Sequence, residues 1–317
     1  MGNIYDGAFR TILNDCRQMI IPVINEIFGE DYTGEEEIEF YPNEHFISKQ
    51  DTAARERITD TSFAILGKLR KKYHIECESS LPDGKILIRL FEYDAQIALD
   101  AGEISEETLT VTFPNTAVLY LRSYKKTPDK MEYVIITPGG TIRYDIPIMK
   151  VQTYSLDDIF DKQLWFMIPF YIFSHEKSFP RYNGNKQELE ELRTEYRDIL
   201  ERLDKLEQQG KIGAFDKQTV IELSCNIIKE IARKYKNVQK GVGDIMVGPM
   251  IETSARRILN QGISQGVSQG IRQGTSETKK EIVLRMLKTQ KLTVEEIAEY
   301  SGLHKDEVEQ LISKQSV

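Results

Sequence analysis

The chain has 317 residues, which is enough for two domains of ordinary size. Hydrophobic residues make up 40% of it and charged residues 29%, a balance that supports a packed core and argues against wholesale disorder. Lysine and arginine number 42 against 50 for aspartate and glutamate, so the net charge is −8. This charge excludes a surface coated in positive charge, but it is compatible with a local basic groove.

Cysteine and histidine usage argues against thiol and zinc enzymes. The residues of these two types are Cys16, Cys77, Cys225, His45, His74, His175 and His304. They lie far apart in the chain, with neither a disulfide framework nor a CxxC pair of zinc ligands.

No segment predicts insertion into a membrane. Charged residues interrupt every apolar run in residues 1–30, so no signal peptide is expected there. The most apolar stretch, residues 164–173, contains Pro169 and has half the length of a membrane-spanning helix. We therefore expect a soluble, cytoplasmic protein without a membrane partner.

The first 150 residues show helical and strand-like patterns in the order α-β-β-β-α-β. Predicted helices cover residues 4–28 and 85–100. Predicted strands cover residues 38–41, 58–66, 72–80, 109–121, 133–137 and 141–148. A turn around Gly67 joins the second and third strands, and Pro138-Gly139-Gly140 predicts a hairpin turn between the last two.

Beyond residue 155 the patterns are helical. Ser155 is a candidate N-cap for a short helix, residues 164–174 predict a buried aromatic segment, and residues 187–208 and 217–238 predict helices. Alternating charges in residues 187–208 indicate a mainly solvated face.

The C-terminal part begins near residue 251. Its glycines recur at four-residue spacing, at Gly262, Gly266, Gly270 and Gly274, which predicts a tether or a weak self-association segment. Residues 292–312 have helix-turn-helix character and suit either DNA contact or protein interaction. The expected divisions are a core domain at 1–175, a helical arm at 176–250, a glycine-repeat linker at 251–291 and a helix-turn-helix-like module at 292–317.

The strongest chemical signal is a group of carboxylates in the predicted hairpin. Glu76 and Glu78 lie two residues apart in one strand and therefore share a face. The turn near Gly67 brings Asp60 across from residues 75–77, within a residue or two. Such oxygen clusters bind Mg²⁺, although acids on an edge strand can also simply face water.

These residues resemble the PD-(D/E)XK nucleases, and among them the bacterial Rpn group of recombination-promoting nucleases, also described as transposases. The resemblance rests on four segments and extends over essentially the whole chain. The segments are Asp6-Gly7-Ala8-Phe9-Arg10, Ile58-Thr59-Asp60, His74-Ile75-Glu76-Cys77-Glu78-Ser79 and Arg89-Leu90-Phe91-Glu92-Tyr93.

The resemblance implies a restriction-endonuclease-like α/β core followed by an α-helical region. It also implies a DNA endonuclease that depends on Mg²⁺, or on Mn²⁺, with Asp60 and Glu76 as metal ligands. Glu78 stands where the family carries lysine or, in the Rpn group, glutamine. The basic role then passes to Lys72, Lys85 or Arg89, or activity has been lost. The expected catalytic residues are Asp60, Glu76, Glu78 and Arg89.

Other residues near this group have two interpretations each. Arg89 and Tyr93 lie four residues apart and share a helix face. Arg89 is interpreted either as a phosphate contact or as a member of a surface ion pair, and a packing role is favoured for Tyr93. Asp6 suits either the site or a helix N-cap. His74 lies on the same strand face as Glu76, and a partly buried structural role is favoured for it.

The expected function is thus phosphodiester hydrolysis on DNA, in recombination or mobile-element biology. The alternative is a nuclease fold that has lost catalysis and serves as a DNA-binding or protein-interaction module. DNA is the expected partner, a homo-oligomer is compatible with the glycine repeat, and no small-molecule cofactor is expected.

Overall fold

The computed structural model describes residues 4–40, 44–47, 55–58, 62–81, 84–246, 293–294 and 297. The chain divides into two compact units, Met1–Ile251 and Glu252–Val317. In the second unit, Ile297 is buried and its backbone N–H donates to Thr293, while the glycine repeat and the rest of the predicted helix-turn-helix module lie outside the described residues. The fold below is that of the first unit.

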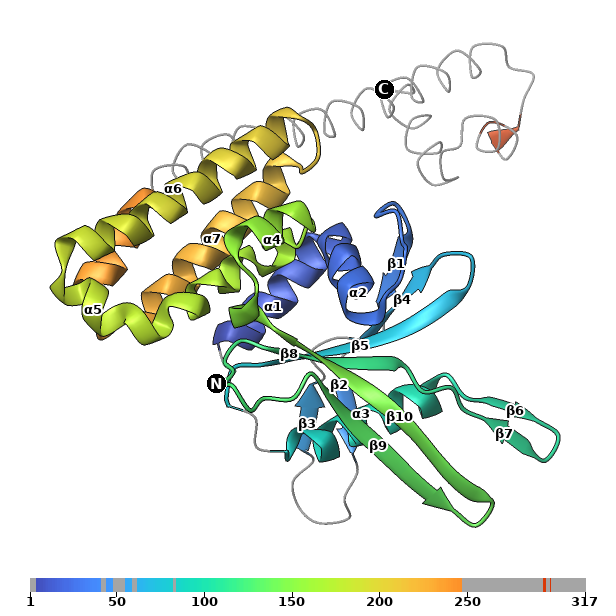
Figure 1. The fold of residues 1–317 in the computed structure, drawn as a ribbon. Helices are drawn as coiled ribbons and strands as arrows, with labels where there is room; N and C mark the ends of the chain where they lie inside the picture. The colour runs from blue at the N-terminus through green and yellow to red at the C-terminus, as the bar shows by residue number, and fades with distance from the viewer. Residues whose placement is uncertain are drawn as a thin grey trace. The chain divides into compact units, whose positions relative to one another are not determined.

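A six-stranded mixed sheet forms the centre of this unit (Figure 1). Its strands, in spatial order, are β1 (Glu37–Phe40), β4 (Ser62–Leu66), β5 (Arg70–Glu78), β8 (Asn115–Tyr120), β10 (Gly140–Lys150) and β9 (Lys130–Thr137). The pairs β5–β8 and β8–β10 are parallel, and the other pairs are antiparallel. Two small hairpins, β2 (Glu44–Ile47) with β3 (Arg55–Ile58) and β6 (Glu103–Ser105) with β7 (Thr108–Thr110), lie outside the sheet.

Helix α3 (Ile86–Asp100) supplies the connection that parallel pairing requires. A parallel pair cannot be closed by a tight turn, so the chain between β5 and β8 must return across one face of the sheet. By contrast β4 and β5 are antiparallel, and residues 67–69 suffice to join them. The predicted turn around Gly67 is therefore confirmed.

Strand β5 separates two different environments. Tyr73, Ile75 and Cys77 belong to the larger hydrophobic core, whereas the intervening residues His74 and Glu76 lie on the other face. Helices α1 (Ile4–Asp15) and α2 (Ile20–Phe28) cover the first face, and α3 covers the second (Figure 1). The alternation thus directs β5's polar side chains toward α3.

An aromatic segment supports the larger core. This segment is the 3₁₀ helix η3 (Trp165–Ser178), whose first nine residues are all buried, including Pro169. Phe166 contacts Phe9 of α1 edge to face, with 5.2 Å between ring centroids. Burying a side chain of this size contributes roughly 1.5–3 kcal/mol. The predicted buried segment at residues 164–174 is confirmed.

Further helices belong to the same unit. They are η1 (Arg17–Met19), η2 (Val151–Thr153), α4 (Leu156–Asp161), α5 (Phe179–Gly184), α6 (Lys186–Gln208) and α7 (Ala214–Ile231), followed by helical residues 236–246. Ser155 caps α4 with a capping box, as predicted, since its Oγ accepts from the Asp158 N–H and Asp158 accepts from the Ser155 N–H. None of the helices described is both long and apolar enough to span a membrane.

Three predicted elements are broken in the structure. The helix predicted at residues 217–238 ends at Ile231, and a turn at residues 232–234 separates it from helical residues 236–246. The helix predicted at residues 4–28 is interrupted at Cys16, whose backbone is non-helical, and continues through η1 into α2. The strand predicted at residues 109–121 is split into β7 and β8, because Pro114 has no N–H to donate to a sheet ladder. The predicted α/β class itself is confirmed.

Candidate active site

Three buried ionisable side chains meet between β5 and α3. His74 and Glu76 come from β5, and Asp94 comes from the buried face of α3. That face also carries Leu90 and Ile97, so the amphipathic pattern of α3 directs Asp94 inward with its apolar neighbours. Such groups are costly to bury unless they are paired, and here they are paired with one another.

Asp94 is the acceptor of a small hydrogen-bond network. Its Oδ1 lies 2.7 Å from His74 Nδ1 and accepts from the Thr116 hydroxyl at 2.7 Å. Its Oδ2 accepts from the Tyr133 hydroxyl at 3.4 Å. Thr116 lies directly opposite His74 in the parallel β5–β8 register. Because a carboxylate has no proton to donate, the Nδ1 atom of His74 carries one.

The charge of His74 follows from these neighbours. Burial acts to lower the pKa of His74, but the Asp94 hydrogen bond and the Glu76 carboxylate outweigh it and raise that pKa to about 9. His74 Nε2 lies 3.7 Å from Glu76 Oε2. In the metal-free chain, His74 is therefore an imidazolium between two carboxylates. The partly buried histidine predicted here is in fact fully buried.

Arg89 joins the two carboxylates of the predicted site. Its guanidinium nitrogen lies 2.7 Å from Glu76 Oε1 and 3.0 Å from Glu78 Oε2. Burial raises the pKa of Glu78, but hydrogen bonds from Ser80 and the charge of Arg89 outweigh it and lower that pKa below its usual range. Glu78 is thus held ionised beside the same cation that contacts Glu76.

Asp6 lies close enough to Glu76 and Glu78 to interact electrostatically with both. Burial, followed by the charges of Glu78 and Glu76, raises the pKa of Asp6 to about 6. Asp6 is the third residue of α1 and lies in its first turn. The structure therefore favours the first of the two predicted roles, in which Asp6 adds an acid to the site.

Four buried polar atoms at this site have no hydrogen-bond partner in the described structure. They are Ser62 Oγ, His74 Nε2, Glu76 Oε2 and Arg89 Nε. Ser62 lies directly opposite His74 in the antiparallel β4–β5 register, and such pairs project from the same face. Among the residues described, no three histidine, cysteine or acidic side chains are arranged as a complete metal site.

The predicted residues are brought together in part. Glu76, Glu78 and Arg89 are in direct contact, and Tyr93 is buried next to His74, with 6.0 Å between ring centroids. Asp60 lies outside the described residues. Of the basic residues suggested to replace the missing lysine, Arg89 is the one shown to contact both carboxylates.

Asp94 was missed by the sequence analysis. The available signal was an acidic residue on the apolar face of a predicted amphipathic helix, between Tyr93 and Ile97. An acid in that position requires a buried partner. Its partner His74 lies 20 residues earlier in the chain, and periodicity alone does not connect the two.

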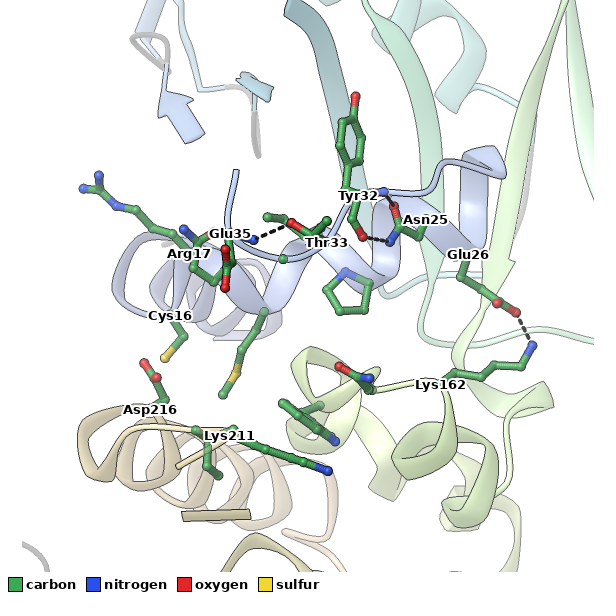
Figure 2. Close-up of a pocket in the computed structure, with 18 of the residues that line it drawn as sticks. Cys16, Arg17, Asn25, Glu26, Tyr32, Thr33, Glu35, Lys162, Lys211 and Asp216 are labelled. Carbon is green, nitrogen blue, oxygen red and sulfur yellow. Dashed lines mark hydrogen bonds and ion pairs between the residues drawn. The ribbon is translucent and has the colours of Figure 1, made fainter. Parts of the chain in front are cut away.

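A separate cavity has a volume of about 1030 Å³ (Figure 2). One side is formed by α2 and the loop that follows it, and the other side by α4, η3 and the α6–α7 turn. Glu76, Glu78 and Arg89 do not line it. Its wall mixes cations and anions, and Glu26 and Lys162 form an ion pair at 2.5 Å. The cavity therefore presents no uniform charge to a ligand.

Cys16 faces Asp216 in this cavity (Figure 2). Burial, reinforced by the Asp216 charge, raises the pKa of the Cys16 thiol to about 12. Because the thiolate is the reactive form, Cys16 is no nucleophile at neutral pH.

Comparison with known proteins provides no family assignment. No family model, curated protein or solved structure matches the chain.

Proposed function

We propose that this protein is a metal-dependent DNA endonuclease of the PD-(D/E)XK type, related to the Rpn recombination-promoting nucleases. The observation that carries this proposal is the buried carboxylate of Glu76. One of its oxygens has no hydrogen-bond partner among the described residues, and Glu78 and Asp6 lie nearby. Accumulating acids at a buried point costs free energy, and binding a divalent cation offsets that cost.

The order of elements supports the same proposal. Helices α1 and α2 precede β1, β4 and β5, which form an antiparallel meander, and α3 then leads to β8, which is parallel to β5. This is the α-β-β-β-α-β order that the resemblance implies, with the β2–β3 hairpin inserted before β4. The proposed site lies on the strand where antiparallel pairing gives way to parallel pairing.

The donor atoms suit a hard divalent cation. Glu76 and, by our proposal, Asp60 would hold Mg²⁺ or Mn²⁺ through carboxylate oxygens. Such an ion polarises the scissile phosphate and lowers the pKa of an attacking water. Arg89, which contacts Glu76 and Glu78, would orient Glu76, and its guanidinium, 40% exposed as a side chain, would donate hydrogen bonds to a phosphate oxygen.

The proposal extends to partners and location. DNA is the proposed substrate, in a cytoplasmic setting, without a small-molecule cofactor. Self-association through the glycine repeat at residues 262–274 is also part of it, and this segment lies outside the described residues.

Cleavage of supercoiled plasmid tests the proposal. Wild type, Asp60→Ala and Glu76→Gln are compared in Mg²⁺, Mn²⁺, Ca²⁺ and EDTA. Glu132→Gln is the matched control, because Glu132 is an exposed strand glutamate paired with Arg143. We expect nicking or linearisation by wild type and control in Mg²⁺ or Mn²⁺ only, and none by the two site variants. Undiminished cleavage by Asp60→Ala or Glu76→Gln would refute the assignment.

A second candidate function is favoured by the position of Arg89. Its guanidinium already contacts both Glu76 and Glu78 and supplies the cluster with one positive charge, which takes over part of the role of a metal ion. On that basis the protein is a nuclease fold without catalysis that binds DNA or another protein. This candidate predicts a gel shift of DNA, or of a partner complex, without cleavage in any divalent cation. Cleavage that depends on Asp60 would exclude it.

A further inference from the structure

We propose that His74 Nε2 and Glu76 Oε2 are two ligands of one metal ion, and that this ion is a first-row transition metal rather than Mg²⁺. The inference rests on the proposed function. It adds a nitrogen ligand to the proposed metal site, and this nitrogen ligand determines which metal ion the site prefers. Its basis is the juxtaposition of two buried atoms on neighbouring positions of one strand face, which form an ion pair at 3.7 Å but make no hydrogen bond.

The first argument is the hydrogen bonding of the ring. Nδ1 of His74 donates to Asp94, whose Oδ1 is held in turn by the Thr116 hydroxyl. Metal-bound histidines usually donate their other ring N–H to a carboxylate in this way, which fixes the ring and leaves the second nitrogen facing the ion. Here that second nitrogen is Nε2, and it faces Glu76.

The second argument is the distance between the two atoms. His74 Nε2 and Glu76 Oε2 lie 3.7 Å apart, too far for a hydrogen bond. Two ligands at about 2.1 Å from one ion, at a tetrahedral angle, lie about 3.4 Å apart. A side-chain adjustment of a few tenths of an ångström therefore closes the pair around an ion, which replaces the Nε2 proton.

The third argument is the unpartnered hydroxyl beside the pair. Ser62 Oγ is buried, has no hydrogen-bond partner in the described structure, and belongs to the residue directly opposite His74. Three buried polar atoms without a hydrogen bond on one face of two neighbouring strands are unusual, because nearly all buried polar groups in folded proteins are hydrogen-bonded. A bound ion, with water in its coordination shell, gives them partners.

The donor set decides which metal binds. Imidazole nitrogen favours ions such as Mn²⁺, Fe²⁺ or Zn²⁺ over Mg²⁺, which prefers oxygen ligands alone. Arg89 already holds the other oxygen of Glu76, so Oε2 remains for the ion. The site therefore combines one nitrogen and one carboxylate oxygen from residues two apart on β5.

The test uses Mn²⁺ as the probe, at pH 8.5, with the full-length protein. Mn²⁺ is titrated and followed by electron paramagnetic resonance, and pulsed spectra are searched for coupling to a nitrogen nucleus. We expect nitrogen coupling in the wild type and in His175→Gln, and its loss in His74→Gln. His175 is the matched control, since it contacts Tyr182 and Glu195 instead. Mg²⁺ is expected to compete at least about tenfold more weakly than Mn²⁺.

If His74→Gln fails to fold, the presence or absence of nitrogen coupling in the wild-type spectrum still tests the inference. A second variant, Asp94→Asn, retains the ligands and removes the charge behind the ring, and we expect it to weaken Mn²⁺ binding about 10–100-fold with the nitrogen coupling kept. Mn²⁺ bound without nitrogen coupling, coupling that survives in His74→Gln, or no Mn²⁺ binding at all overturns the inference. Plasmid cleavage in Mg²⁺ is scored separately, so cleavage by a wild type that shows no nitrogen coupling leaves the proposed function standing.

Discussion

His74 Nε2 lies 3.7 Å from Glu76 Oε2, while Nδ1 of the same ring lies 2.7 Å from Asp94 Oδ1. One buried imidazole therefore links a carboxylate of the sheet to a carboxylate of α3. This link makes the electrostatics of the candidate site inseparable from the packing of α3 on the sheet, and the predictions below test that connection.

Replacing Arg89 separates the acids from their shared cation. In Arg89→Met the methionine keeps the apolar stem, but Glu76 and Glu78 lose their counter-charge. We expect the metal-free protein to lose about 1–3 kcal/mol of unfolding free energy, since Glu76 is buried while Arg89 is partly exposed. Mn²⁺ is expected to raise the melting temperature of this variant more than that of wild type.

The control for Arg89 is Arg143→Met. Arg143 pairs with Glu132 at 3.0 Å, but both side chains are exposed, so we expect a change below about 1 kcal/mol. An Mn²⁺ stabilisation of Arg89→Met no larger than that of wild type would count against a metal at Glu76.

Removing Asp94 leaves several donors without an acceptor. In Asp94→Ala the His74 ring and the hydroxyls of Thr116 and Tyr133 all lose their shared partner. We expect the free energy of unfolding to fall by about 3–5 kcal/mol, measured by urea denaturation. Asp145→Ala, which removes an exposed aspartate paired with Lys130, should cost less than about 1 kcal/mol. Equal losses in the two variants would contradict the buried network.

The stability of the metal-free protein should fall between pH 6.5 and about 9. The pKa of His74 is raised from 6.5 to about 9 in the folded chain, so folding favours the protonated ring. This contribution is complete below pH 6.5 and disappears as the pH rises through about 9. A shift of this size corresponds to stability on the order of 3 kcal/mol.

Urea unfolding in EDTA across this pH range measures the effect. We expect His74→Gln to flatten the decline and His175→Gln to keep it. The raised pKa of Asp6, about 6, produces its own change at lower pH and leaves this window clear. A wild-type profile that is flat from pH 6.5 to 9 would show that His74 is neutral in the folded protein.

Thiol reagents should react slowly with the native protein. Cys16, Cys77 and Cys225 are all buried, and with a pKa of about 12 only about one Cys16 thiol in 10⁴ is ionised at pH 8. We expect negligible labelling by a water-soluble disulfide reagent at pH 8 over minutes, and three thiols per chain after addition of denaturant. Rapid labelling of one thiol in the native state would show that the cavity beside Cys16 opens.

Local patterns predicted much of the fold. The helix at residues 85–100, the Ser155 cap and the turn at residues 67–69 depend on side chains close together in sequence, and the structure confirms each. The periodicity predicted elements that are too long at two places, where a single residue, Cys16 or Pro114, interrupts the helix or strand. A missing backbone donor or a non-helical backbone angle ends an element that the neighbouring residues would continue.

The two-residue period of a strand by itself determined that His74, Glu76 and Glu78 share one face. Only the tertiary structure decided what they meet there, because Asp94 and Arg89 reach them from α3 and Thr116 from β8. Those contacts depend on how α3 crosses the sheet and on the parallel register of β5 with β8, which no local periodicity encodes. The sequence therefore predicts which carboxylates share a strand face, whereas the cations and hydrogen bonds that determine their charge state and ligand binding depend on tertiary packing.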